Sequence, residues 1–97
     1  MATRRRSKTL DRDTAEAVAL QGLAFLAEDG ARLARFLALT GLEMAEVRAR
    51  AGSRELSAAV LEHLCADESL LLVFAASRGL APDSIARAAA LLQAEAP

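Results

Sequence analysis

The sequence predicts an all-α protein, a compact bundle of five or six short helices. Apolar residues make up 54% of the 97-residue chain, yet aromatic residues only 3%, and much of the difference is alanine, the best helix former. Apolar residues also recur at spacings of three and four, which is typical of amphipathic helices. Capping residues and glycines divide the chain into short segments. One domain with a modest core is therefore expected.

Six helices are expected, at about residues 14–28, 31–40, 43–51, 54–65, 68–78 and 82–94. Asp13 and Glu16 have the spacing of a capping box, which places the start of the first helix at residue 14. Gly22 interrupts that helix at a cost in helix propensity, so we expect a neighbouring helix to approach closely there. Ser53 is a suitable N-cap for the fourth helix, and Pro82 suits the first turn of the last one.

The helix at 68–78 is expected to be the central element. Its segment Leu70–Ala76 is apolar without a break, and a helix that is apolar on all sides is expected to be buried on all sides. Asp67 can cap its N-terminus, and Gly79 can end it with a positive φ angle. The phenylalanines all stand in apolar stretches that are interpreted as core: Phe25, Phe36 and Phe74.

The two halves of the chain resemble each other at an offset of 38 residues. At this offset Asp29 matches Asp67, Phe36 matches Phe74, and Gly41 matches Gly79. The matched positions are caps, core residues and stops, so the repeat is structural in character. The sequence therefore predicts an approximate internal duplication, two three-helix units that share one core.

Charge is unevenly distributed along the chain. The net charge is −1, but residues 1–12 hold five basic residues and one acidic residue, a net charge of +4. We expect residues 1–12 to be a basic, disordered N-terminal arm and residues 13–97 to be the helical domain. The arm could contact phosphates through four side chains or could be only a solvated tail. These candidate nucleic-acid contacts are Arg4, Arg5, Arg6 and Lys8.

A helix-turn-helix spacing occurs near the C-terminus, with a small residue at Ala75, a glycine turn at Gly79 and an aliphatic residue at Ile85. The last helix begins with Pro82 and Asp83, however, and has few side chains that read bases. The interpretation favoured is a motif used only for packing. If the arm does bind nucleic acid, it could be assisted by Arg48, Arg50 or Arg87.

No metal, cofactor or catalytic site is expected. His63, Cys65 and Asp67 are ligand types, but this segment offers two ligands on one face at most, and zinc usually takes three or four. No nucleophile motif or glycine-rich phosphate loop occurs, so we do not expect an enzyme. Cys65, the single cysteine, fits a reducing compartment, and apolar runs fall short of the ~20 residues of a membrane span. A cytoplasmic protein that does not enter membranes is expected.

The sequence has more apolar residues than one small core is expected to need. The surplus is either an interface, with a partner protein or a second copy, or alanine that tolerates exposure. The leading hypothesis for function is a small helical protein-interaction module that binds a partner or forms a homodimer through apolar helix faces. The alternative is a nucleic-acid-associated protein that uses the basic arm and the helix-turn-helix-like unit.

The segments AVALQGLAFLAED, RLARFLALTGL and AAVLEHLCADESLLLVFAASRGLAPDSIARA resemble an uncharacterised family of short bacterial helical proteins, a domain of unknown function. The resemblance covers about residues 14–92, and its most specific part is Ala66–Phe74. It implies an all-helical domain in a bacterial cytoplasm. It implies no catalytic residue, ligand or partner.

Overall fold

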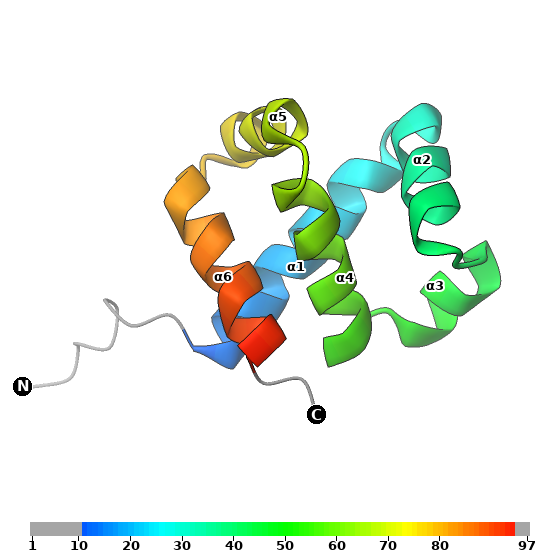
Figure 1. The fold of residues 1–97 in the computed structure, drawn as a ribbon, viewed down its shortest axis with the longest axis horizontal. Coiled ribbons are helices and arrows are strands. Elements are labelled where there is room, and N and C mark those ends of the chain that lie inside the picture. The colour runs from blue at the N-terminus through cyan, green and yellow to red at the C-terminus, as the bar shows by residue number, and fades with distance from the viewer. Residues whose placement is uncertain (1–10, 95–97) are drawn as a thin grey trace, which may run out of the picture.

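The computed structural model describes residues 11–94, which fold into α-helices without any strand (Figure 1). In chain order, the helices are α1 (Arg12–Ala27), α2 (Gly30–Thr40), α3 (Met44–Arg50), α4 (Arg54–Cys65), α5 (Glu68–Arg78) and α6 (Pro82–Ala94). The predicted all-α fold with six short helices is confirmed. The bounds expected for the last three helices agree with the structure. The start of α2 differs by one residue, and α1 and α3 differ by one or two residues at both ends.

Local capping explains most of these bounds. The Asp29 carboxylate accepts hydrogen bonds from the backbone N–H groups of Ala31 and Arg32, and the Asp67 carboxylate accepts one from Leu70 N–H at 3.1 Å. Gly41 and Gly79 end α2 and α5 in the left-handed conformation, with φ angles of 76° and 67°. The helix ends are therefore determined by residues close to them in the sequence.

The expected start of α1 was wrong by two residues. Asp11, rather than Asp13, is the N-cap, and its carboxylate accepts a 2.8 Å hydrogen bond from Thr14 N–H. Asp13 lies in the first helical turn, where a negative charge suits the positive end of the helix dipole. The helix therefore begins within the segment that was expected to be a basic arm. Residues 1–10, the rest of that segment, lie outside the described residues.

The helices pack on both sides of a central pair. Helices α1, α4 and α6 make the most extensive contacts with one another, and α1 and α4 lie between α5 and α6 on one side and α2 and α3 on the other (Figure 1). The core is filled by the inward residues of these helices and the three phenylalanines, of which Phe36 and Phe74 are fully buried. Their large apolar area makes the core possible in a chain rich in alanine.

The expectation that α5 is the central, fully buried helix was wrong. Of its residues only Phe74 and Ala75 are buried, whereas Leu72 and Val73 are each 47% exposed. Helix α5 packs against α4, α6 and α1 from one side only, so its outer face meets solvent. A continuous apolar run therefore did not mean burial on all sides here.

Close packing between α1 and α4 depends on Gly22. A β-carbon at this position would lie 2.8 Å from Leu64 Cδ1 and 3.1 Å from Val60 Cγ1, both on α4. Real β-carbons do not approach so closely in well-packed cores, so only glycine allows this spacing of the helix axes. The predicted close approach at Gly22 is confirmed.

The internal duplication is not established by the fold. The paired positions do share local roles, since Asp29 and Asp67 are both N-caps and Gly41 and Gly79 are both left-handed stops. The two proposed units nevertheless pack differently. Helix α6 lies along α4 and α1, whereas α3, its counterpart in the first unit, is only seven residues long and contacts mainly α4. The similarity therefore extends to the caps and stops but not to the packing of the third helix.

Candidate interaction groove

An apolar groove lies between α1 and the α2–α3 pair. Its volume is about 290 Å³, and it opens to solvent. One wall is a stripe of α1 with helical spacing, formed by Leu20, Leu23, Ala24 and Ala27. The facing wall comes from α2, α3 and the residue that follows α3, and consists of Leu33, Met44, Val47, Arg48 and Ala51. We refer to this site as the α1–α2–α3 groove.

The groove exists because α3 is too short to cover α1. Helix α3 is attached through Val47, its one buried residue, and packs on α4 rather than along α1. The other face of α1, which includes Ala15, Ala19 and Leu26, is fully covered. Helix α1 is apolar nearly all round because it has two apolar faces. One face is buried in the core, and the other lines the groove, where Leu20 is 47% exposed.

Arg48 is the only charged residue in the groove wall. Its side chain is exposed and makes no ion pair within residues 11–94. The surrounding segment, residues 31–54, holds five arginines and two glutamates, a net charge of +3. The remaining residues of 11–94 hold ten acidic and three basic side chains, a net charge of −7. The wall formed by α2 and α3 therefore belongs to a positive segment, whereas Glu28 and Asp29 directly follow the α1 wall.

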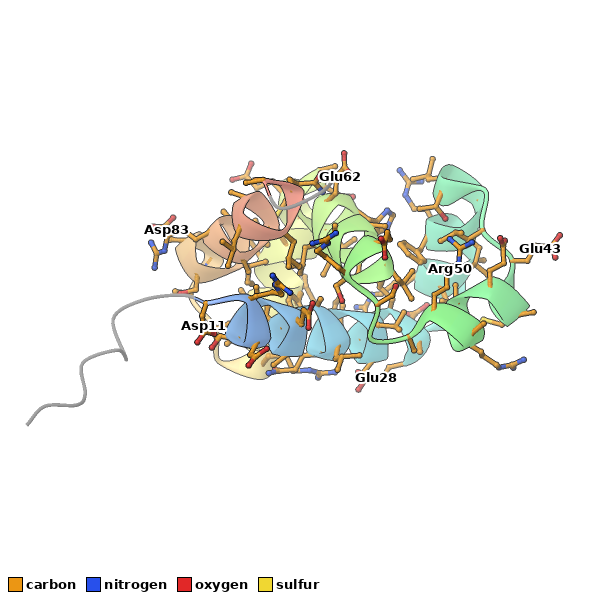
Figure 2. All side chains as sticks on the ribbon, turned by 90° about the horizontal axis from the view of Figure 1, so that it is seen from below. Asp11, Glu28, Glu43, Arg50, Glu62 and Asp83 are labelled. Atoms are coloured by element: carbon orange, nitrogen blue, oxygen red, sulfur yellow. The ribbon has the colours of Figure 1, made fainter. Side chains whose placement is uncertain are left out.

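The two ends of the molecule carry different charged residues. Glu43 and Arg50 mark the α2–α3 end, and Asp11 and Asp83 mark the opposite end, where α1 and α6 begin (Figure 2). Asp13 and Glu16 add negative charge to the first turns of α1. A charged partner would consequently meet different potentials at the two ends.

A second, smaller hollow of about 200 Å³ lies between the end of α2 and α4. Its lining includes Leu42 and Leu56, but also Arg50 and Glu55, which carry opposite charges. An apolar side chain that filled this hollow would remove these charged groups from water, which costs free energy. The α1–α2–α3 groove is the more favourable site for an apolar ligand.

The residues considered for metal binding are used in other ways. The Asp67 carboxylate caps α5, and the His63 ring packs edge-on against Phe36 with 5.1 Å between the ring centroids. His63 Nε2 is buried and has no hydrogen-bond partner. Residues 11–94 contain no group of three or more His, Cys, Asp or Glu side chains that could hold a metal ion.

The ionisation of His63 and Cys65 is shifted by their surroundings. Burial lowers the pKa of His63, the nearby positive charge of Arg35 lowers this pKa further, and Asp67 acts in the opposite direction. Burial also raises the pKa of the Cys65 thiol, which therefore favours its protonated, less nucleophilic form. Both shifts favour the neutral forms of these side chains.

An ion pair and stacked arginines connect three helices beside the groove. Arg78 of α5 donates a 2.9 Å hydrogen bond to Glu28 at the end of α1. The guanidinium of Arg32 on α2 lies 4.2 Å from the centroid of the Phe25 ring, which itself contacts the Phe74 ring at 5.3 Å. The contact between Arg32 and Phe25 holds α2 against α1, whereas the ion pair and the contact between the two phenylalanine rings hold α5 against α1.

The helix-turn-helix spacing corresponds to the α5–α6 turn. Leu80 N–H donates to the Ala75 carbonyl at 2.9 Å, Gly79 is left-handed, and Ala75 and Ile85 are buried. These positions of the motif take part in packing between α5 and α6. The predicted contacts Arg4, Arg5, Arg6 and Lys8 lie outside the described residues.

The arginines expected to assist the arm do not form one surface. Arg48 and Arg50 belong to α3, whereas Arg87 belongs to α6, and these helices lie on opposite sides of the α1–α4 pair (Figure 1). Arg48 is placed instead in the wall of the apolar groove.

Sequence reasoning did not identify the groove. The first helix was interpreted only as apolar nearly all round, without a separate role for Leu20, Leu23 and Ala27. Met44 was not considered. A signal was present, since α1 has a second apolar stripe at helical spacing beyond the one that its core face needs. Which helix would leave this stripe open could not be read from the sequence.

The fold and the groove define a small all-α domain with an open apolar groove between α1 and the α2–α3 pair. The chain belongs to the family described as "Protein of unknown function (DUF3572)", whose model matches residues 12–95. No curated protein and no solved structure is significantly similar to the chain. Among residues 11–94, none of the helices has the length and apolar character needed to cross a membrane.

Proposed function

We propose that this protein is a small interaction module that binds a partner protein in the α1–α2–α3 groove. The observation that carries the proposal is the uncovered stripe of α1, opposite a second apolar wall. Covering apolar surface yields about 25 cal/mol per Å² removed from water, and side chains that fill a preformed hollow gain packing as well. A partner's apolar side chains would supply both.

The chemistry of the groove favours a protein over a small molecule as its ligand. Small-molecule sites combine an apolar surface with several polar groups that orient the ligand, in volumes of about 300–1,000 Å³. Here the volume is about 290 Å³, and the wall offers one charged side chain and otherwise only apolar ones. Side chains projecting from a folded partner need no such orienting groups.

The proposal is tested by a matched pair of variants. Leu20 on α1 and Leu72 on α5 are the same residue type with the same 47% exposure, but only Leu20 lines the groove. Leu20→Glu should abolish capture of the partner from the native cells, because it places a charge in the apolar wall. Leu72→Glu should leave the capture unchanged. Urea unfolding of both variants shows whether either substitution alters the fold.

Three results would contradict the proposal. Loss of capture with Leu72→Glu alone would move the interface to the outer face of α5. Equal capture by both variants and the natural chain would exclude the groove. Recovery only of material that nuclease removes would favour the alternative, nucleic-acid association through Arg4, Arg5, Arg6 and Lys8, whose binding should also weaken steeply with salt.

A further inference from the structure

We infer that the α1–α2–α3 groove accepts an amphipathic helix of another protein, and that this helix carries an acidic side chain opposite Arg48. The inference rests on the proposed function and names the chemical class of the partner. It draws on three features of the groove: the saturation of its backbone groups, the spacing of its apolar residues, and the unpaired charge at its edge.

The backbone of the walls favours a helical occupant. The α1 wall lies within a helix, from Leu20 to Ala27, where N–H and C=O groups are engaged in the helix itself. No strand edge occurs in residues 11–94, so an extended peptide would find no main-chain partners. A buried extended peptide would leave its own backbone groups unsatisfied, whereas a helix satisfies them internally.

The spacing of the α1 wall matches that of a helix packed along it. Leu20, Leu23, Ala24 and Ala27 follow one another at intervals of three, one and three residues, which is a single ridge on the helix surface. Elsewhere in the fold, ridges of this kind are covered by helices. Ile85, Ala88, Ala89 and Leu92 of α6 have the same spacing and are buried against α1 and α4. An incoming helix with apolar residues at positions i, i+3, i+4 and i+7 would form the equivalent contact.

The charge at the groove edge selects an acidic flank. Arg48 is exposed in the wall without an ion-pair partner in the described part of the chain, and residues 31–54 carry a net charge of +3. A basic side chain on the incoming helix opposite Arg48 would meet repulsion from its guanidinium. An acidic flank would meet attraction, and a guanidinium binds a carboxylate with two parallel hydrogen bonds.

A charge-exchange selection tests this inference. The probe is a displayed library of amphipathic helices in which apolar residues are fixed at i, i+3, i+4 and i+7 and the flanking positions vary among Glu, Gln and Lys. Helices selected on the full-length chain should be enriched in Glu on one flank. Helices selected on Arg48→Glu should be enriched in Lys at the same positions, and those selected on Arg87→Glu, a control on α6, should keep the preference for Glu.

For a selected acidic helix, Arg48→Glu should weaken binding about five- to tenfold, the range expected when one exposed ion pair becomes a repulsion. Exchange of the flanking Glu of the selected helix for Lys should restore its binding to Arg48→Glu. Arg48→Gln should give an intermediate loss, and it serves as the test if Arg48→Glu lowers the helix content measured by circular dichroism.

Each remaining result is decisive. Helices that require Leu20 but show no flank preference, or a preference unaffected by Arg48→Glu, would overturn the inference and leave the proposed function in place. Helices that bind Leu20→Glu as well as the natural chain would overturn the groove itself. No enrichment, together with sedimentation showing a dimer that Leu20→Glu dissociates, would identify a second copy of this chain as the occupant and overturn the inference.

Discussion

Gly22 of α1 lies so close to Leu64 of α4 that a β-carbon at position 22 would be 2.8 Å from Leu64 Cδ1. Leu64 and Val60, the second neighbour at 3.1 Å, are both buried in the core and have little room to move. The absence of one methyl group thus determines how closely two of the three main core helices pack.

Gly22→Ala is expected to destabilise the protein by about 1 kcal/mol. Overpacking a core costs about 1–3 kcal/mol, and the gain in helix propensity on replacing glycine, about 0.5–1 kcal/mol, offsets part of it. The free energy of urea unfolding measures the difference. The matched control is Gly30→Ala at the start of α2, where nothing lies within 4 Å of an added β-carbon and the substitution should be neutral or stabilising. Equal stabilisation by both substitutions would contradict the packing account.

Phe74→Ala is expected to cost about 3–5 kcal/mol of the free energy of unfolding, because the ring is fully buried and contacts the Phe25 ring at 5.3 Å. Leu72→Ala, two residues away on the exposed face of α5, should cost less than about 1 kcal/mol. If Phe74→Ala prevents folding altogether, Phe74→Leu provides a measurable variant with a smaller loss. A loss under about 1 kcal/mol for Phe74→Ala would contradict its burial.

Gly79→Ala should destabilise the α5–α6 turn by about 1–2 kcal/mol, since Gly79 has a φ angle of 67° that residues with a β-carbon disfavour. No atom lies within 4 Å of a β-carbon there, so the cost is one of backbone conformation and not of collision. Gly79→Asn should cost less, because asparagine tolerates the left-handed region better. Equal losses for alanine and asparagine would point to a different cause.

Stability should fall as the pH drops below about 6.5, the ordinary pKa of histidine, because of His63. Burial and Arg35 lower the pKa of His63 in the folded state, so below pH 6.5 the unfolded chain binds a proton that the folded chain does not. The loss should end once the pH passes below the folded-state pKa. Unfolding of the natural chain and His63→Gln, measured from pH 7.5 to 5, isolates this contribution from that of the carboxylates.

The pH prediction has an independent check in the ring signals of His63. Titration followed by nuclear magnetic resonance should give a pKa below 6.5, and Arg35→Gln should move it upward because a repelling charge is removed. Asp67→Asn should move it downward, since Asp67 acts in the opposite direction. A pKa at or above 6.5 in the natural chain would show that the ring is more hydrated than its packing against Phe36 indicates.

The sequence by itself determined the helices and much of their internal chemistry. Asp29, Ser53 and Asp67 cap helices through hydrogen bonds to backbone groups two or three residues away, and Gly41 and Gly79 end helices through their own φ angles. These interactions are local, so they can be read from neighbouring residues. The largest error in a helix start, two residues at α1, arose where Asp11 and Asp13 were both suitable caps within two residues.

The tertiary structure alone decided which apolar faces are covered. Leu72 and Leu20 stand in helices as apolar as those that fill the core, yet both are 47% exposed. Burial depends on where other helices lie, and this is fixed by long-range contacts such as that of Gly22 with Leu64 and the packing of α3 on α4. A hydrophobic pattern indicates that a helix face can be buried. Only the packing of distant segments determines whether that face is buried, and hence where a groove remains open.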